Sequence, residues 1–399
     1  MVEFSYEELE FVETVDEILV LFMKLYRFSI KKGDLSAIGP YQITKHSIEI
    51  NAPERSANTK FNRLLSDGFS GMVGPNNKKT VYVHKGLGVP LIGSNVIGIV
   101  DRDTNVIEVK PLTGCNLNCT FCSVDEGVSS RKTQDFIIEE QFLVEEFAKV
   151  ARLKKYPLEA HIAGHSEPTL YPWLLELVRD LRKISRVKDV AIDTNGTLLT
   201  EAALEQLISA GLTRVDLSIH AMDKELARKL AGTAYDLGQI LTLARFLARK
   251  KCLLLTPVYL PGINDAEIEK LIIFSKELCC PIGIQNFLPY DQGRNPVKGI
   301  GMDAFFEKLS QWEKKYCVDL RLKDVFSFQK DKVLEKPFRK GDKVIAQVVF
   351  PGKYFQEIVV MAKGRLITVR GFSKRVAAGE RVKVRIVRDK HNVFLGVIP

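Results

Sequence analysis

Between about Ser94 and residue 330, short apolar stretches alternate with longer segments that have a helical period. We expect six strands there: Val106–Leu112, Leu158–Ala163, Val187–Asp193, Arg214–Ile219, Leu253–Tyr259 and Ile282–Phe287. Repeated strand and helix units favour a parallel sheet with helices outside it, closed or half closed as a barrel. Because chemistry in such sheets sits at the carboxyl ends of the strands, the loops after these stretches are the first candidates for a site.

The segments on either side have different patterns. Residues Tyr6 to Ile30 are interpreted as an amphipathic helix, and an ambiguous stretch containing Gly and Asn follows, so we assign residues 1–93 no function. After about Leu334, patterns of short strands separated by turns replace the helical period. The expected strands are Lys343–Phe350, Ile358–Ala362, Arg365–Arg370, Val382–Val387 and Val393–Val397. Five short strands in fewer than 60 residues favour a small barrel of the oligonucleotide-binding (OB) type.

The sequence therefore predicts an α/β protein with three parts. Residues 1–93 form an α+β N-terminal region, residues 94–330 a partial (β/α)6 barrel, and residues 338–399 a small all-β, OB-like barrel. The formal net charge is +9, and residues 341–399 hold twelve Lys and Arg against four Asp and Glu. This net +8 leaves only +1 for residues 1–340, so the basic tail predicts a polyanionic partner, most simply nucleic acid.

The composition also bounds the cellular setting. The chain begins MVEFSYEELEFVE, which is acidic where a signal peptide is cationic, and no apolar run reaches the roughly 18 residues of a bilayer span. We therefore expect a cytoplasmic protein without a membrane partner. Seven cysteines in such a chain are expected to be thiols or metal ligands rather than a disulfide framework.

Three cysteines follow the first expected strand in the segment TGCNLNCTFC, which puts Cys115, Cys119 and Cys122 in one short loop. Soft thiolates at this spacing select iron–sulfur clusters or zinc. Structural zinc takes four protein ligands, whereas three thiolates on a four-iron cluster leave one iron open to a substrate or cofactor. An inert zinc or iron–sulfur knuckle is the alternative at this point.

The C-x3-C-x2-C spacing, with Phe121 before the last cysteine, resembles the signature of the radical S-adenosylmethionine (SAM) superfamily. The resemblance implies a [4Fe-4S] cluster held by Cys115, Cys119 and Cys122. It also implies that SAM chelates the fourth iron and is cleaved to a 5'-deoxyadenosyl radical. A low-potential electron donor such as ferredoxin or flavodoxin is then an expected partner.

Other segments resemble landmarks of this superfamily in the same order. GHSEP, residues 164–168, resembles the GGEP motif that holds the SAM amino group, although Ser166 stands where glycine is usual. DTNGT, residues 193–197, and LSIHAMD, residues 217–223, end the next two strands. The resemblance assigns the following residues to SAM: Phe121, Gly164, Ser166, Glu167, Pro168, Asn195, Ser218 and His220. His220 is also a candidate for contact with the substrate, and no other catalytic residue is assigned.

The other cysteines are Cys252, Cys279, Cys280 and Cys317, which share no cluster spacing. We expect buried structural thiols, with the alternative that one of them carries a methyl group or donates a hydrogen atom. No cysteine precedes Cys115, which argues against methylthiotransferases, since these ligate a second cluster through N-terminal cysteines.

From about Lys340 the sequence resembles a TRAM domain, a small RNA-binding barrel, in the segments KGDKVIAQV, AAGERVKVRI and NVFLGV. Phosphate contacts by Lys and Arg, and stacking by Tyr354 or Phe355, would give salt-dependent RNA binding. The candidate RNA-binding residues are Lys353, Tyr354, Arg365, Arg370, Lys374, Arg375, Arg381, Lys383 and Arg385. A solvated charged face on a docking domain is the alternative.

Together these features resemble an archaeal group of radical SAM proteins that end in TRAM, a group whose reaction the sequence does not identify. The leading hypothesis is an enzyme that modifies a nucleotide in structured RNA, tRNA before rRNA. A second hypothesis is an enzyme for a protein or small molecule that its tail tethers to RNA. A third is a non-catalytic RNA-binding iron–sulfur protein. The oligomeric state and the group transferred are not readable from the sequence.

Overall fold

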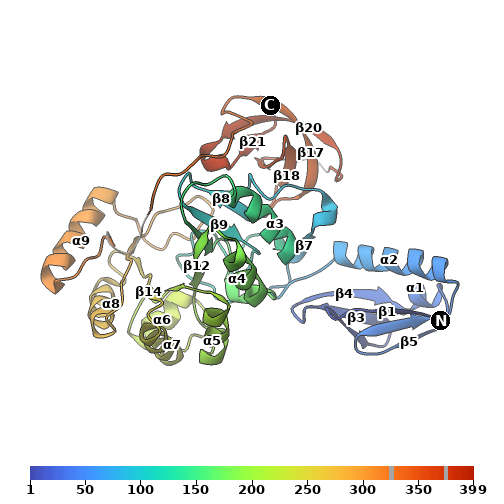
Figure 1. The fold of residues 1–399 in the computed structure, drawn as a ribbon, viewed down its shortest axis with the longest axis horizontal. Helices are drawn as coiled ribbons and strands as arrows, with labels where there is room; N and C mark the ends of the chain where they lie inside the picture. The colour runs from blue at the N-terminus through green and yellow to red at the C-terminus, as the bar shows by residue number, and fades with distance from the viewer. Residues whose placement is uncertain (323–327, 373–375) are drawn as a thin grey trace. The chain divides into compact units, whose positions relative to one another are not determined.

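The computed structural model describes residues 1–322, 328–372 and 376–399, and the chain divides into two compact units (Figure 1). One unit comprises Met1–Val83 together with Thr133–Ile137. The other comprises His84–Lys132 together with Ile138–Pro399. The continuous part of the first unit therefore ends at Val83, ten residues before the boundary expected at residue 93. The unit also includes Thr133–Ile137, which lies within the expected barrel region of the sequence.

The N-terminal unit is built mainly from antiparallel strands. One sheet has the order β1 (Val2–Ser5), β6 (Ser47–Ile50), β5 (Tyr41–Ile43), and a second has the order β2 (Leu9–Glu13), β3 (Glu17–Phe22), β4 (Tyr26–Lys31). A third pairs β7 (Lys79–Val83) with β10 (Gln134–Ile138). The helices are α1 (Lys32–Ser36) and α2 (Glu54–Ser70).

The prediction of an amphipathic helix from Tyr6 to Ile30 is wrong, because this stretch forms β2, β3 and β4. Burial alternates residue by residue along β3 and β4, which is the period of a strand and not of a helix. The β3–β4 hairpin turns at Met23 and Lys24, both at positive φ. Such a turn normally has Asn or Gly at these positions, so the usual sequence signal for a hairpin is missing here.

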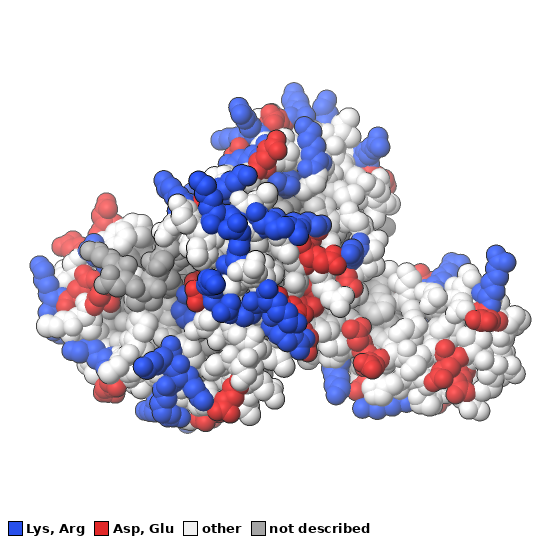
Figure 2. Space-filling view, in the orientation of Figure 1, with Lys and Arg blue, Asp and Glu red and all other residues white. Residues whose placement is uncertain are grey.

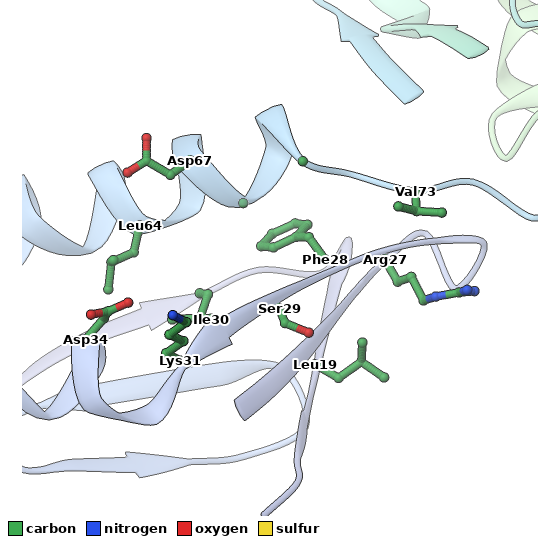
Figure 3. Close-up of a pocket in the computed structure, with 12 residues that line it drawn as sticks. Leu19, Arg27, Phe28, Ser29, Ile30, Lys31, Asp34, Leu64, Asp67 and Val73 are labelled. Carbon is green, nitrogen blue, oxygen red and sulfur yellow. The ribbon is translucent and has the colours of Figure 1, made fainter. Parts of the chain in front are cut away.

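The helix α2 covers one face of the N-terminal unit, and a groove of about 470 Å³ lies beside it along β4 (Figure 3). The Phe28 side chain lies between β4 and the helix. A Cβ atom on Gly68 of α2 would approach the Phe28 ring to 2.3 Å, so glycine at this position lets the helix pack on the sheet.

The second unit contains the barrel that the sequence predicts. Its parallel strands run in the order β9 (Val106–Lys110), β11 (Leu158–Ile162), β12 (Val187–Thr194), β13 (Arg214–Leu217), β14 (Leu253–Leu255), and β8 (Gly98–Asp101) is antiparallel at the edge. A parallel bridge from Leu255 to Ile282 and the parallel pair β15 (Val258–Tyr259) and β16 (Gln285–Asn286) continue the curve. The strand expected from Leu253 to Tyr259 is thus divided at Pro257, which has no N–H group to donate to a neighbouring strand.

Helices alternate with these strands: α3 (Glu140–Ala151), α4 (Leu174–Lys183), α5 (Glu201–Ala210), α6 (Lys224–Ala231), α7 (Leu237–Arg249), α8 (Asp265–Glu277) and α9 (Met302–Tyr316). Three of them begin at a side chain that accepts from the first turn, namely Thr200, Asp223 and Asp236. None of the helices in the described ranges is long and apolar enough to cross a membrane.

The C-terminal strands form a closed five-stranded barrel in the order β17-β18-β19-β21-β20 (Figure 1). They are β17 (Lys343–Pro351), β18 (Glu357–Ala362), β19 (Arg365–Arg370), β20 (Arg381–Arg388) and β21 (Leu395–Val397). The core of this barrel is apolar and includes Val360, Val384 and Phe394. Val384 and Ile386 of β20 point inward, while Arg381, Lys383 and Arg385 are exposed.

Candidate active site

The three cysteines of TGCNLNCTFC lie in the loop that follows β9, at the carboxyl edge of the parallel sheet. The backbone N–H of Leu117 donates to Cys115 Sγ at 3.4 Å, and that of Glu126 donates to Cys122 Sγ at 3.3 Å. Hydrogen bonds of this kind favour the thiolate form of cysteine. Arg294 donates to the carbonyl of Cys119 at 2.9 Å and thereby fixes the backbone of the loop.

The thiols of this loop are costly to ionise without a cation. Burial, followed by the neighbouring Cys122, raises the pKa of the Cys119 thiol to about 12. Burial, followed by the Glu167 carboxylate and the two other cysteines, raises the pKa of Cys115 well above its usual range. Because a metal centre stabilises clustered thiolates, the donor set fits an iron–sulfur cluster.

The cysteine loop rests on the C-terminal end of α6. Asn118 N donates to the carbonyl of Ala231 at 2.9 Å, and Thr120 N donates to that of Leu230 at 3.0 Å. Gly232 ends the helix at φ +66°, and a Cβ atom there would come within 2.1 Å of the Asn118 carbonyl oxygen. Only glycine fits this position, so the end of α6 fixes the path of the loop.

Glu167 of the GHSEP segment ties two strand ends together. Its buried carboxylate accepts from Thr194 Oγ1 at 2.7 Å, from Asn195 N at 2.8 Å and from Thr169 Oγ1 at 2.7 Å. Burial raises the pKa of Glu167, although these donors favour its ionised form. Oε1 is fully engaged, whereas Oε2 accepts from a single donor and keeps a lone pair for a further one.

The other predicted cofactor residues surround the same space. Ser166 Oγ is buried and has no hydrogen-bond partner among the described residues. Asn195 donates through Nδ2 to Asn116 at 3.0 Å. His220 accepts from Val258 N at Nδ1, 3.1 Å away, and burial lowers its pKa to about 4, so its imidazole is neutral. The Phe121 ring packs edge-on against His220 at 4.8 Å.

These side chains line one cavity at the carboxyl ends of the strands. Its lining includes Cys115, Cys119, Ser166, Glu167, Asn195, Ser218 and His220. Gly164 and Pro168 shape the loop instead of lining the cavity: a Cβ atom on Gly164 would meet Lys110 Cγ at 2.9 Å, and Pro168 begins a short 3-10 turn. Tyr235, which no sequence motif indicates, lies in the loop after α6 and lines the cavity near Cys119.

Comparison with known proteins agrees with this geometry. The profile of the Radical SAM superfamily matches residues 109–274. The chain is also 33% identical over 432 aligned positions to Uncharacterized protein MJ0103 of Methanocaldococcus jannaschii, with 98% of each chain covered. The chain belongs to the radical SAM superfamily.

Two further similarities are narrower. The chain is 31% identical over 186 residues to the GTP 3',8-cyclase of Aquifex aeolicus, an alignment that covers 45% of this chain and 55% of that one. Among solved structures, SuiB of Streptococcus suis bound to its precursor peptide SuiA aligns over 80% of this chain and 72% of that one, with 13% identity and a TM-score of 0.43.

A radical SAM enzyme uses a [4Fe-4S] cluster and SAM, which together supply a 5'-deoxyadenosyl radical when bound. In this chain Cys115, Cys119 and Cys122 form the donor set that would hold the cluster. Ser166 Oγ and Glu167 Oε2 would offer a hydroxyl and a carboxylate to the polar groups of SAM. The described lining of the cavity includes neutral His220 but not the Phe121 ring, which packs against His220.

The inner face of the radical SAM barrel carries a network of charged side chains. Arg214 pairs with Glu159 at 2.7 Å and with Asp216 at 2.7 Å, and His161 pairs with Asp193 at 2.8 Å. His161, Asp193 and Asp216 lie close enough together to bind a metal ion. The Arg214 guanidinium already supplies positive charge to Asp216, so the network is explained as ion pairs.

The network predicts a loss of stability in acid. Arg214 and His161 lower the pKa of Glu159 to about 2 despite its burial, so this carboxylate stabilises the fold above its unfolded pKa near 4.5. This contribution, about 3 kcal/mol, is lost as the pH falls from about 5 toward 2. Denaturant unfolding of the wild type and Glu159→Gln at several pH values should show a difference that is constant above pH 5 and disappears near pH 2. A difference independent of pH would contradict the assignment.

The four remaining cysteines do not all fit the expectation of buried thiols. Cys252 is buried, and Cys280 is half-buried. Cys279 and Cys317 are exposed, which corrects the prediction. Both have positive φ at the end of a helix, where the chain turns away from the core.

The predicted RNA-binding residues divide into four groups. Arg381, Lys383 and Arg385 are exposed on β20, and Lys and Arg side chains stand out from the C-terminal barrel in Figure 2. Arg370 pairs with Glu357 beside a large cavity, and Arg365 is held by the Glu335 carbonyl and Asn392. Lys374 and Arg375 lie outside the described residues.

Lys353 and Tyr354 do not form an exposed RNA-binding surface. Lys353 is buried and forms an ion pair with Glu126 at 2.7 Å, and it donates to the Val124 carbonyl at 2.8 Å. The Tyr354 hydroxyl donates to the same carbonyl at 2.8 Å. The loop between β17 and β18 therefore holds the segment that follows Cys122, a role that the charge of Lys353 does not reveal from sequence.

Proposed function

We propose that this radical SAM enzyme modifies a nucleotide within structured RNA, with tRNA as the first candidate and rRNA as the second. The observation that carries the proposal is a cavity of about 820 Å³ whose wall combines strands of the radical SAM barrel with strands of the basic C-terminal barrel. A substrate that contacts the basic barrel therefore also reaches the neighbourhood of the cofactor site. We also expect the enzyme to be cytoplasmic and to receive electrons from a low-potential donor.

The outer face of β17 and β20 supports an RNA partner. In the register of these two strands, Lys343 lies opposite Arg385 and Ile345 lies opposite Lys383. All four side chains are exposed. An apolar side chain among cations suits a backbone contact next to a base or ribose. No carboxylate within the described ranges forms an ion pair with these cations, so their charge is available to phosphate.

This face makes a measurable prediction for binding. In Arg381→Gln/Lys383→Gln/Arg385→Gln, each lost phosphate contact should lower the magnitude of the slope of log K against log salt by about 0.7–0.9, or about 2–3 in total. Fluorescence anisotropy with bulk tRNA at several salt concentrations measures this slope. The control is Lys188→Gln. Lys188 is an exposed lysine at the amino end of β12. An unchanged slope in the triple variant would remove β20 from the RNA interface.

The activity itself is tested with reconstituted, anaerobic enzyme, SAM, a reductant and bulk tRNA or rRNA. Nucleoside mass spectrometry should find a new modified nucleoside, together with 5'-deoxyadenosine, and neither product with Cys119→Ala. A free nucleotide is the second candidate substrate, favoured by the similarity to GTP 3',8-cyclases over about half of the chain. Product formed from GTP in the absence of RNA would support that candidate.

A further inference from the structure

The large cavity of the second unit lies directly beside the cofactor site. Its barrel wall includes Glu108, His161 and Asp193, and Asp193 also lines the cavity that holds the cysteines. Its other wall includes Arg370 of β19, Arg388 of β20 and Leu395 of β21. A group bound in this cavity is thus next to the place where the radical is generated.

The lining matches the chemistry of a nucleotide. Tyr290 lines the cavity and is 51% exposed, so its aromatic ring can stack on a base; Phe328 is a second aromatic residue of the lining. Arg388 is exposed at the cavity and forms no ion pair with a carboxylate in the described part of the chain. The carboxylates of the barrel wall form ion pairs, and their further lone pairs can accept from the amino groups of a base. The cavity thus offers separate partners to a phosphate and a base.

A β-bulge brings Arg388 to this position. Along β20, Arg385 is opposite Val397 and Ile386 is opposite Gly396, but the next partner of β21, Leu395, is opposite Arg388 instead of Val387. The extra residue shifts the alternation, so the cations at 381, 383 and 385 are followed by Arg388. At about 3.3 Å per residue, this row is roughly 23 Å long and ends at the cavity.

We propose that β20 guides the RNA backbone to the cavity, and that Arg388 binds the phosphate of the target nucleotide while its base enters the cavity and stacks on Tyr290. This inference rests on the proposed function and adds the position of the target nucleotide. The target base has to leave its stack to enter the cavity, which favours loops, bulges and single-stranded ends of structured RNA. In this arrangement the affinity for RNA comes from Arg381, Lys383 and Arg385. The position of the target nucleotide in the cavity is set by Arg388.

The test uses the reconstituted full-length enzyme and bulk tRNA as the probe. Ultraviolet cross-linking followed by peptide mass spectrometry should place nucleotides on the peptides that contain Tyr290 or Phe328. In Arg388→Gln, the yield of these cross-links should fall about tenfold, whereas the affinity for tRNA should change by less than about twofold. In Arg381→Gln/Lys383→Gln/Arg385→Gln, affinity and yield should fall together. Iron content and uncoupled cleavage of SAM, equal to wild type, show that each variant is folded.

Three results would overturn the inference. Cross-links confined to other surfaces, or an unchanged yield in Arg388→Gln, would remove the cavity as the nucleotide site while leaving an RNA substrate intact. Labelling of Tyr290 or Phe328 by radioactive GTP, with no cross-link to tRNA, would assign the cavity to a free nucleotide. Absence of any binding to tRNA or rRNA by the wild-type enzyme would reject the proposed function as well.

Discussion

Replacing Cys119 by alanine is expected to lower the iron content of the reconstituted enzyme from about four atoms per chain to less than about one. Formation of 5'-deoxyadenosine should fall below detection. Two thiolates are too few to hold a four-iron cluster in a loop where burial already opposes ionisation of each thiol. Iron and sulfide analysis, electron paramagnetic resonance of the reduced enzyme and chromatography of the SAM products measure the three effects.

The matched control is Cys279→Ala. Cys279 is exposed at the end of α8 and takes no part in the cysteine loop, so iron content and SAM cleavage should equal those of the wild type. Tightly bound zinc without sulfide in the wild-type protein, or full activity in Cys119→Ala, would contradict the assignment of the cluster ligands.

The radical SAM barrel could be predicted from sequence because its determinants are local. Each buried strand reads as a short apolar run, and each motif stands at the end of such a run, as with Glu167 after β11 and Asn195 after β12. The fold then brings the motifs together, since the carboxyl ends of parallel strands meet at one edge. The family resemblance of these motifs, together with their order along the chain, therefore indicated much of the cavity lining, whereas Tyr235 was missed.

The N-terminal unit was not predictable in the same way. Its first strands are joined by the Met23-Lys24 turn, which lacks the residues that usually signal a hairpin. The segment Thr133–Ile137 belongs to this unit although it lies within the barrel region of the sequence. Pairing between residues far apart in sequence has no local signal, so neither periodicity nor turn residues could indicate it.

Charge was the least reliable guide to individual residues. The excess of Lys and Arg after residue 340 was counted correctly, but Lys353 pairs with Glu126, which is 227 positions earlier. The same loop places Tyr354 on the segment after Cys122. The C-terminal barrel therefore has a structural role beside the cysteine loop in addition to any contact with RNA. Deleting residues 340–399 would disturb both at once, which makes point variants on β20 the cleaner test of RNA binding.

The buried contact between the two barrels of the second unit predicts an asymmetric loss of stability. Glu126 pairs with the ammonium groups of both Lys132 and Lys353, and all three side chains are buried. Glu126→Gln leaves two buried cations without their common carboxylate, so the free energy of unfolding should fall by about 3–5 kcal/mol. Lys353→Met leaves the pair of Glu126 and Lys132 intact, so its loss should be only about 1–2 kcal/mol.

Denaturant unfolding of the reconstituted proteins under anaerobic conditions measures both losses. Glu225→Gln is the control, because its exposed pair with Arg228 is worth less than about 0.5 kcal/mol. Lys353→Met should also retain less iron than the control, since the segment that follows Cys122 loses its tie to the β17–β18 loop. If Lys353→Met proved as destabilising as Glu126→Gln, the shared carboxylate could not be the centre of this contact, and the hydrogen bond of Lys353 to Val124 would have to account for the loss.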